Sequence, residues 1–294
     1  MPDNYLETNN ELLGPLTEGK PKKKRNPWGI VLRIFLLFVL VVSLSITALL
    51  LYVKINFPDS IFVQGLSMYP LLNSTALRAE TQSDGSIVYK PLFANDNGTY
   101  NLNRTNRDGD IVDYGYSDPR EGTLNSLKRF DIVLSYYPED YGSDGKLLPT
   151  ADAKIKRVIG LPGETVRLDM DNSPMARLKI NGEVVEQPGN TFENYNRAFL
   201  SAGIETSYPA SILDPLALSW TGREVKLGED EYYLAGDNRY GSASKDSRTI
   251  GPVKRKMLKA RFAMVIAQAK IKENGTRCDL IYSSLKWPWQ VQPL

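Results

Sequence analysis

Residues 65–72 read Gly65-Leu66-Ser67-Met68-Tyr69-Pro70-Leu71-Leu72, a short apolar segment that carries a single serine. The chain contains no histidine, so a Ser-His-Asp triad and a zinc site of the H-E-x-x-H type are both excluded. If Ser67 is a nucleophile, lysine is the best-known base that remains for a serine hydrolase. We therefore look for a partner lysine and expect neither a metal site nor a cofactor.

A long apolar run ends shortly before this segment. Residues 34–53 read IFLLFVLVVSLSITALLLYV, without a charge or a proline. About 20 residues at about 1.5 Å each cover the roughly 30 Å of a bilayer core. A cleaved signal peptide would have a shorter apolar core and a small-residue cleavage site, so we favour a retained anchor.

The residues before the apolar run set its orientation. Residues 1–19 are polar, as in a disordered tail, and the basic cluster Lys20-Pro21-Lys22-Lys23-Lys24-Arg25 follows. The positive-inside rule places that cluster in the cytoplasm. We expect a cytoplasmic tail over 1–27, a transmembrane helix over 28–54, and an extracytoplasmic domain over 55–294. The predicted location is a bacterial cell membrane, crossed once.

Composition narrows the function further. The chain has 294 residues, a net charge of +2 and one cysteine, Cys278. The near-neutral charge argues against a nucleic-acid binder, and a lone cysteine cannot form an intramolecular disulfide. Four N-x-[ST] sequons, at Asn73, Asn97, Asn103 and Asn274, are read as chance matches in Asn-rich loops.

The part of the chain after residue 54 favours an all-β domain. Short β-branched and aromatic segments alternate with turn signals, and they cover 61–66, 86–89, 110–112, 130–136, 153–160, 165–168, 177–180, 231–236 and 261–267. Asn181-Gly182 predicts a hairpin over 177–185. The polar stretches near 73–127 and 189–227 are read as insertions.

Lys156 stands out among the lysines because its neighbours Ile155, Val158 and Ile159 are apolar. Burial disfavours the ammonium form and lowers the pKa of a lysine, as a lysine base requires. On this strand Arg157 is then expected to face outward.

Four segments of the sequence now combine. They are Ser67-Met68-Tyr69-Pro70, Arg129-Phe130-Asp131-Ile132-Val133, Lys156-Arg157-Val158-Ile159-Gly160-Leu161-Pro162-Gly163-Glu164, and Gly236-Asp237-Asn238-Arg239 with Ser244-Lys245-Asp246-Ser247-Arg248. In this order, after one N-terminal span, they resemble the sequence boxes of the bacterial type I signal peptidases. Relatives that use a histidine in place of the lysine do not fit a chain without histidine.

The resemblance implies a domain of two packed antiparallel sheet regions and a serine endopeptidase that removes signal peptides. It implies Ser67 as nucleophile, Lys156 as general base and Ser244 as the residue that orients the lysine. It also implies ion pairs of Asp237 with Arg157 and of Asp246 with Arg248.

The oxyanion donors and the substrate follow from the same resemblance. Donors are expected at the amide of Ser67 and at Gly65, where some relatives use a serine hydroxyl. Met68 is the candidate for the substrate pocket, although plain core packing explains it equally well. The partners are the lipid bilayer and secreted preproteins cut after a small-x-small sequence. Such a peptide is expected to add as a strand beside the segments before Ser67 and before Lys156.

Two points stay open. Four residues rather than two separate the halves of the last box, so Ser242 competes with Ser244 as the partner of the lysine. The chain could also be a non-catalytic relative that assists assembly of surface structures, although such relatives typically lose the serine or the lysine. A self-cleaving repressor of related fold is disfavoured by the membrane span.

Overall fold

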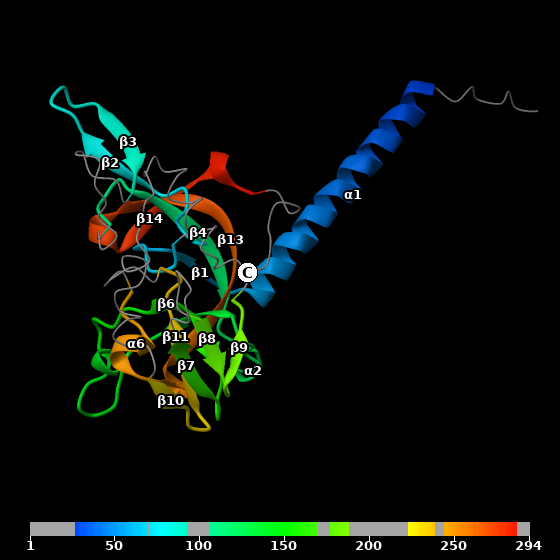
Figure 1. Ribbon diagram of the computed structural model, residues 1–294. Helices are drawn as coiled ribbons and strands as arrows, with labels where there is room; N and C mark the ends of the chain where they lie inside the picture. The colour runs from blue at the N-terminus through cyan, green and yellow to red at the C-terminus, as the bar shows by residue number, and fades with distance from the viewer. Residues whose placement is uncertain are drawn as a thin grey trace, which may run out of the picture. The chain divides into compact units, whose positions relative to one another are not determined.

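The computed structural model describes residues 27–69, 71–92, 106–169, 177–187, 223–238 and 244–286. It falls into an N-terminal helical unit and a β-rich unit, which are described separately (Figure 1). Helix α1, Pro27–Asn56, has 30 residues and is long and apolar enough to cross a membrane. It covers the predicted span, whereas the basic cluster at 20–25 lies outside the described residues.

The β-rich unit is built of antiparallel strands, as predicted. Within the described residues the larger sheet has ten strands in the order β12-β11-β6-β5-β13-β4-β2-β3, with β1 beside β4 and β14 beside β13. Its strands are β1 (Asp59–Phe62), β2 (Leu77–Thr81), β3 (Ile87–Pro91), β4 (Ile111–Asp118), β5 (Ile132–Ser135), β6 (Lys154–Gly160), β11 (Glu231–Ala235), β12 (Val253–Lys254), β13 (Leu258–Lys272) and β14 (Arg277–Ile281).

A smaller sheet has the order β10-β7-β8-β9. Its strands are β7 (Thr165–Asp169), β8 (Arg177–Ile180), β9 (Glu183–Val185) and β10 (Glu224–Lys226). The predicted hairpin is formed by β8 and β9, with Asn181 and Gly182 at φ values of 52° and 89°. Two positive φ values are what a two-residue turn of this kind requires.

Strand β13 connects most of the large sheet. It has 15 residues and pairs with β5, β4 and β14 along its length. Register shifts near Met264 and Ala267 bend it, as bulges do. Gly115 of β4 faces this bend, and a Cβ there would lie 2.3 Å from the Met264 carbonyl oxygen.

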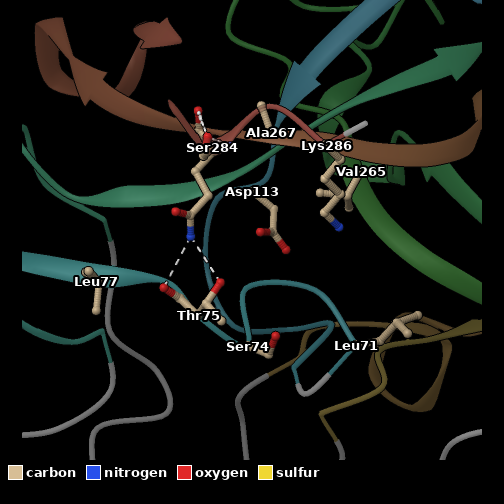
Figure 2. A pocket seen from close by; sticks show the side chains of 10 residues that line it. Leu71, Ser74, Thr75, Leu77, Asp113, Val265, Ala267, Ser284 and Lys286 are labelled. Atoms are coloured by element: carbon tan, nitrogen blue, oxygen red, sulfur yellow. Dashed lines mark hydrogen bonds between the residues drawn. The ribbon is translucent and has the colours of Figure 1, made fainter. Parts of the chain in front are cut away.

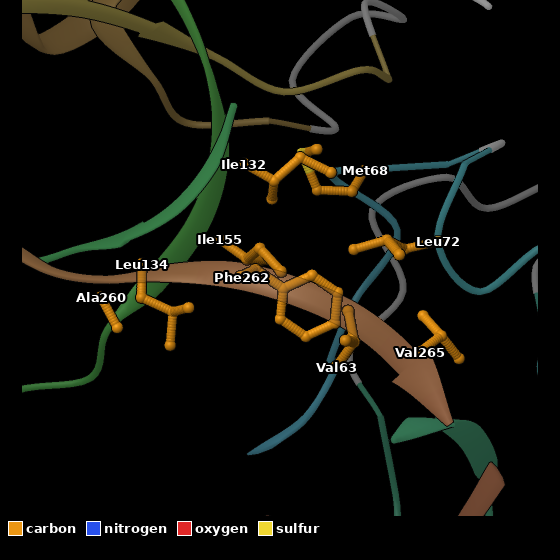
Figure 3. Close-up of a cluster of buried hydrophobic side chains, with 9 residues drawn as sticks. All are labelled: Val63, Met68, Leu72, Ile132, Leu134, Ile155, Ala260, Phe262 and Val265. Carbon is orange, nitrogen blue, oxygen red and sulfur yellow. The ribbon is translucent and has the colours of Figure 1, made fainter. Parts of the chain in front are cut away.

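Three hydrophobic clusters of described residues help to hold the unit together. One packs residues 63–72 against β5, β6 and β13 (Figure 3) and consists of Val63, Met68, Leu72, Ile132, Leu134, Ile155, Ala260, Phe262 and Val265. A second lies around Tyr137 and Val158. The third joins the two sheets through Ile159 of β6, Val166 of β7 and Tyr233 of β11. Neighbouring residues of β6 therefore enter different clusters.

Several elements differ from the sequence prediction. The stretch 73–127, expected to hold an insertion, contributes β2, β3 and the central strand β4 to the large sheet. β4 reads I-V-D-Y-G-Y-S-D, and its buried polar residues hide the usual strand pattern. Strands β2, β10, β12 and β14 and the short helices α2 (Glu121–Asn125) and α6 (Ser247–Ile250) were not predicted.

Candidate active site

Ser67 and Lys156 lie together although 89 positions separate them. The Lys156 Nζ atom is 2.9 Å from Ser67 Oγ and 2.8 Å from the carbonyl oxygen of Ile155. Lys156 projects from β6, whereas Ser67 belongs to the turn that follows β1. We call residues 63–69 the Ser67 turn. Lys156 is 3% exposed, while Ser67 is half-buried, so the serine is accessible and the lysine is not.

Burial sets the protonation of Lys156. It lowers the pKa of the Lys156 amine from 10.5 to about 8, and the carboxylate of Asp246 opposes this shift, while the charge of Arg248 adds to it. Burial disfavours the ammonium form because water no longer solvates the charge. An amine with this pKa can accept a proton near neutral pH.

Asp246 organises residues 244–248, which lie next to Lys156 and which we call the Asp246 loop. Its carboxylate accepts hydrogen bonds from Gly236 N at 2.8 Å, Ser244 Oγ at 2.7 Å and Arg248 Nε at 2.9 Å. Burial would raise the pKa of Asp246, but the Arg248 charge and these hydrogen bonds hold it below the ordinary value. The structure thus brings Asp246 and Arg248 together as an ion pair in which both side chains are fully buried.

The predicted contact between Ser244 and Lys156 is not formed. The Ser244 hydroxyl donates to Asp246, and Lys156 Nζ contacts Ser67 Oγ and the carbonyl oxygen of Ile155. Ser244 therefore has no direct orienting contact with the lysine, and the carbonyl of Ile155 takes that place. The competing residue Ser242 lies outside the described residues.

Arg157 also departs from one expectation. It was expected to face outward, yet it is 7% exposed and forms a two-pronged pair with Asp237, at 2.7 Å from Nε and 2.6 Å from Nη2. Its Nη1 donates to the carbonyl of Phe130. Strand β6 is buried on both faces, so a charged residue within it needs a partner of opposite charge.

Three asparagines to which the sequence assigned no role at the site contact the Ser67 turn. Asn238 donates from its backbone to the carbonyl of Ser67 and from its side chain to that of Leu66, each at 3.0 Å. Asn73 donates to the carbonyl of Gly65 at 2.8 Å. Asn106 accepts the N–H of Gly65. Gly65 has φ +73°, a conformation that glycine adopts without strain.

Asn73 is bound in turn to Asp113. The Asn73 N–H donates to Asp113 Oδ2 at 2.6 Å, and the Asp113 N–H donates to Asn73 Oδ1 at 2.8 Å. Asn73 is fully buried, so its sequon is not accessible to glycosylation. No spacing rule points to this pair, because 40 residues separate its members.

A pocket of about 820 Å³ lies beside this pair (Figure 2). Its lining comes from the segment after the Ser67 turn, from β4 and β13 and from the end of the described chain, and comprises Leu71, Ser74, Thr75, Leu77, Asp113, Val265, Ala267, Gln268, Ser284 and Lys286. Burial raises the pKa of Asp113, opposed by the Asn73 N–H and by the charge of Lys286.

Met68 is placed in the core. It is 1% exposed and packs in the cluster with Leu72, Ile132 and Ile155 (Figure 3). In this structure Met68 therefore packs as a core residue. Among the described residues, no group of three or more Cys, Asp or Glu side chains is placed to hold a metal ion.

A family model described as signal peptidase, peptidase S26, matches residues 32–267. The chain belongs to this signal peptidase family. The match extends from α1 into β13 and includes Ser67, Lys156, Asp237 and Asp246.

Named signal peptidases are among the similar proteins. Signal peptidase I V of Bacillus subtilis (strain 168) is 36% identical over 133 residues, which are 45% of this chain and 62% of that protein. Signal peptidase I of Bacillus amyloliquefaciens is 30% identical over 131 residues, 44% of this chain and 60% of that protein. The alignment thus spans about three fifths of the length of either relative.

One solved structure is also similar. It is a signal peptidase I from Enterococcus faecalis V583, 24% identical, matched over 47% of this chain and 98% of that chain, with a TM-score of 0.30.

Proposed function

We propose that this chain is a membrane-anchored serine endopeptidase that removes signal peptides from exported preproteins. The observation that carries the proposal is the buried amine of Lys156, 2.9 Å from the hydroxyl oxygen of Ser67, in a member of the signal peptidase family. Ser67 is the nucleophile and Lys156 the general base. The alternative, a non-catalytic accessory protein for surface assembly, is not favoured, because both residues are present and in contact.

Acylation begins with a neutral Lys156. Its Nζ accepts the proton of the Ser67 hydroxyl as Oγ forms a bond to the scissile carbonyl carbon, whose oxygen becomes the oxyanion. The oxyanion then collapses, the C–N bond breaks, and the ammonium of Lys156 returns the proton to the leaving amine. The mature protein departs and the signal peptide remains as an ester of Ser67.

Deacylation repeats the cycle with water. Lys156 accepts a proton from water as the hydroxide oxygen attacks the ester carbonyl. Collapse breaks the bond to Ser67 Oγ, which recovers its proton from Lys156. Both steps need a Lys156 amine that is neutral at rest. The apolar residues around it, such as Ile155, favour the neutral amine because they disfavour the ammonium form.

Two strand edges can receive an extended substrate. β1 pairs only with β4 within the described residues, and positions 154–156 of β6 pair with β5 but not with β11. A peptide that adds along these edges places its carbonyl beside Ser67, through main-chain hydrogen bonds. Small side chains before the cut are inferred from the family.

The cleavage assay uses the detergent-solubilised protein and a model preprotein, with the cut mapped by mass spectrometry. We expect one cut after a small-x-small sequence, no cut with Ser67→Ala, and full activity in EDTA. Full activity of Ser67→Ala, or a loss in EDTA that added metal restores, contradicts the proposal.

The membrane topology has its own test. The basic cluster Lys20–Arg25 precedes the uncharged run, so the tail over 1–27 should be cytoplasmic and the domain over 55–294 extracytoplasmic. Protease added to spheroplasts should cut within residues 80–125 and leave an epitope on the N-terminal tail intact. Digestion of the tail with protection of the domain contradicts this orientation.

A further inference from the structure

The N–H group of Gly65 is already engaged. This group lies two residues before Ser67, at the position where the family resemblance places the second oxyanion donor. In the structure it donates to the side-chain oxygen of Asn106. The N–H of Ser67, in contrast, has no acceptor among the described residues. One of the two expected backbone donors is thus available and the other is occupied.

Asn106 also carries a donor, the Nδ2 atom of the same side-chain amide whose oxygen accepts the Gly65 N–H. Its oxygen must face Gly65 because the backbone N–H requires an acceptor, so the orientation of the side-chain amide is fixed by its partner. Its Nδ2 atom is buried and has no hydrogen-bond partner among the described residues. Such a donor costs free energy at rest, and an unpaired buried group calls for a ligand, a water or a catalytic role.

We propose that Asn106 is a catalytic residue that supplies the second oxyanion donor through Nδ2, with the Ser67 N–H as the first. This inference rests on the proposed peptidase function. The same side chain fixes the Gly65 peptide through its oxygen, so one residue sets the turn and meets the charge that develops on the carbonyl. Asn106 lies in the segment between β3 and β4, outside the four sequence boxes.

The chemistry suits a neutral amide. An oxyanion forms only after Ser67 attacks, so a donor that is unpaired at rest gains its partner in the transition state, which raises kcat rather than substrate binding. A side-chain amide in this role is worth about 100- to 1000-fold in kcat. Gly65 has no side chain, and its own amide points to Asn106.

Two variants separate the donor from the turn. Asn106→Asp keeps an oxygen for the Gly65 N–H but removes the donor, whereas Asn106→Leu removes both. We expect both to lower kcat for a model preprotein by about 100-fold with KM little changed, measured on the high-pH plateau where Lys156 is neutral. Asn125→Asp, at an exposed site that contacts Arg255, is the matched control and should match wild type.

A reactive inhibitor gives a second readout. A peptide aldehyde with a small-x-small sequence adds Ser67 Oγ to its carbonyl carbon, and the resulting oxygen occupies the oxyanion position. Its affinity should fall in both variants by about the same factor as kcat, whereas the matching peptide alcohol should bind all three proteins equally. Retained binding of the alcohol also shows that the variants are folded.

The outcomes are distinct. If wild type does not cleave, the proposed function itself fails. If wild type cleaves and Asn106→Asp cleaves at the wild-type rate, the donor assignment is overturned, whatever Asn106→Leu does. A rise in KM with unchanged kcat, or an equal loss of aldehyde and alcohol binding, likewise overturns it.

Discussion

Gly236 packs so closely against Ser244 that a Cβ at Gly236 would lie 2.2 Å from the Ser244 hydroxyl oxygen. The same atom would lie 2.4 Å from the carbonyl oxygen of Ser67. Gly236, the residue that follows β11, thus meets the Ser67 turn and the Asp246 loop at one point, where only a residue without a side chain fits.

Gly236→Ala should therefore disable the site. The added methyl must push the Ser67 turn or the Asp246 loop away. A displacement of about 1 Å at a reacting group costs about 100-fold in rate. Gly228→Ala is the control, because its nearest neighbour is the end of the Glu231 side chain at 3.3 Å. Preprotein cleavage by the two folded variants checks this, and equal rates contradict the packing argument.

The buried pair of Arg157 and Asp237 should matter for stability. Asp237→Ala leaves the Arg157 guanidinium, 7% exposed, without its carboxylate partner, which costs about 3–5 kcal/mol in the free energy of unfolding. Asp144→Ala removes a carboxylate from an exposed pair with Lys146 and should cost less than about 1 kcal/mol. Urea unfolding measures both, and a similar small loss for each would show that the buried pair is not structural.

Asp113 should tolerate asparagine better than alanine. Asn retains an oxygen for the buried Asn73 N–H, whereas Ala leaves that N–H unpaired at a cost of about 1–3 kcal/mol. Burial raises the pKa of Asp113, so ionisation destabilises the fold above that pKa and the effect is absent below the unfolded pKa of about 3.9. Asp113→Asn should equal or exceed wild type in stability at pH 7. An Asn variant as unstable as the Ala variant would contradict this role.

Lys156→Met should stabilise the protein while abolishing cleavage. The folded pKa of about 8 lies below 10.5, so the protonated lysine favours the unfolded chain. This penalty is fully present below about pH 8 and vanishes above about pH 10.5, and it amounts to about 3 kcal/mol at pH 7. Unfolding free energies at pH 7 and pH 10.5 check the sign, and a gain that grows with pH would contradict it.

Elements that depend on local sequence patterns could be predicted from the sequence. The apolar run, the Asn181-Gly182 hairpin and the strands around Ile132 and Lys156 follow from periodicity and turn chemistry, which depend on near neighbours. Only the start of strand β4, at 110–112, was predicted, because the buried polar residues Asp113, Ser117 and Asp118 break the apolar pattern. Asp113 binds Asn73, 40 positions away, which no local window contains.

The site shows the same division. The family boxes brought Ser67, Lys156, Asp237 and Asp246 to notice. The roles of Asn73 and Asn106 depend on contacts across about 40 residues, of Asn73 with Asp113 and of Asn106 with Gly65. The outward direction expected of Arg157 failed because β6 is covered on both faces, which its own sequence does not reveal.

Single-turnover cleavage of a preprotein by wild type and Lys156→Arg, across a pH series, tests the central claim that a neutral Lys156 is the base. Wild type should gain rate with rising pH along an acid limb with an apparent pKa near 8. Arginine keeps the charge but cannot be deprotonated in proteins, so folded Lys156→Arg should not cleave at any pH. Near-normal turnover by Lys156→Arg, or a wild-type rate without an acid limb, would contradict the assignment of Lys156 as the base.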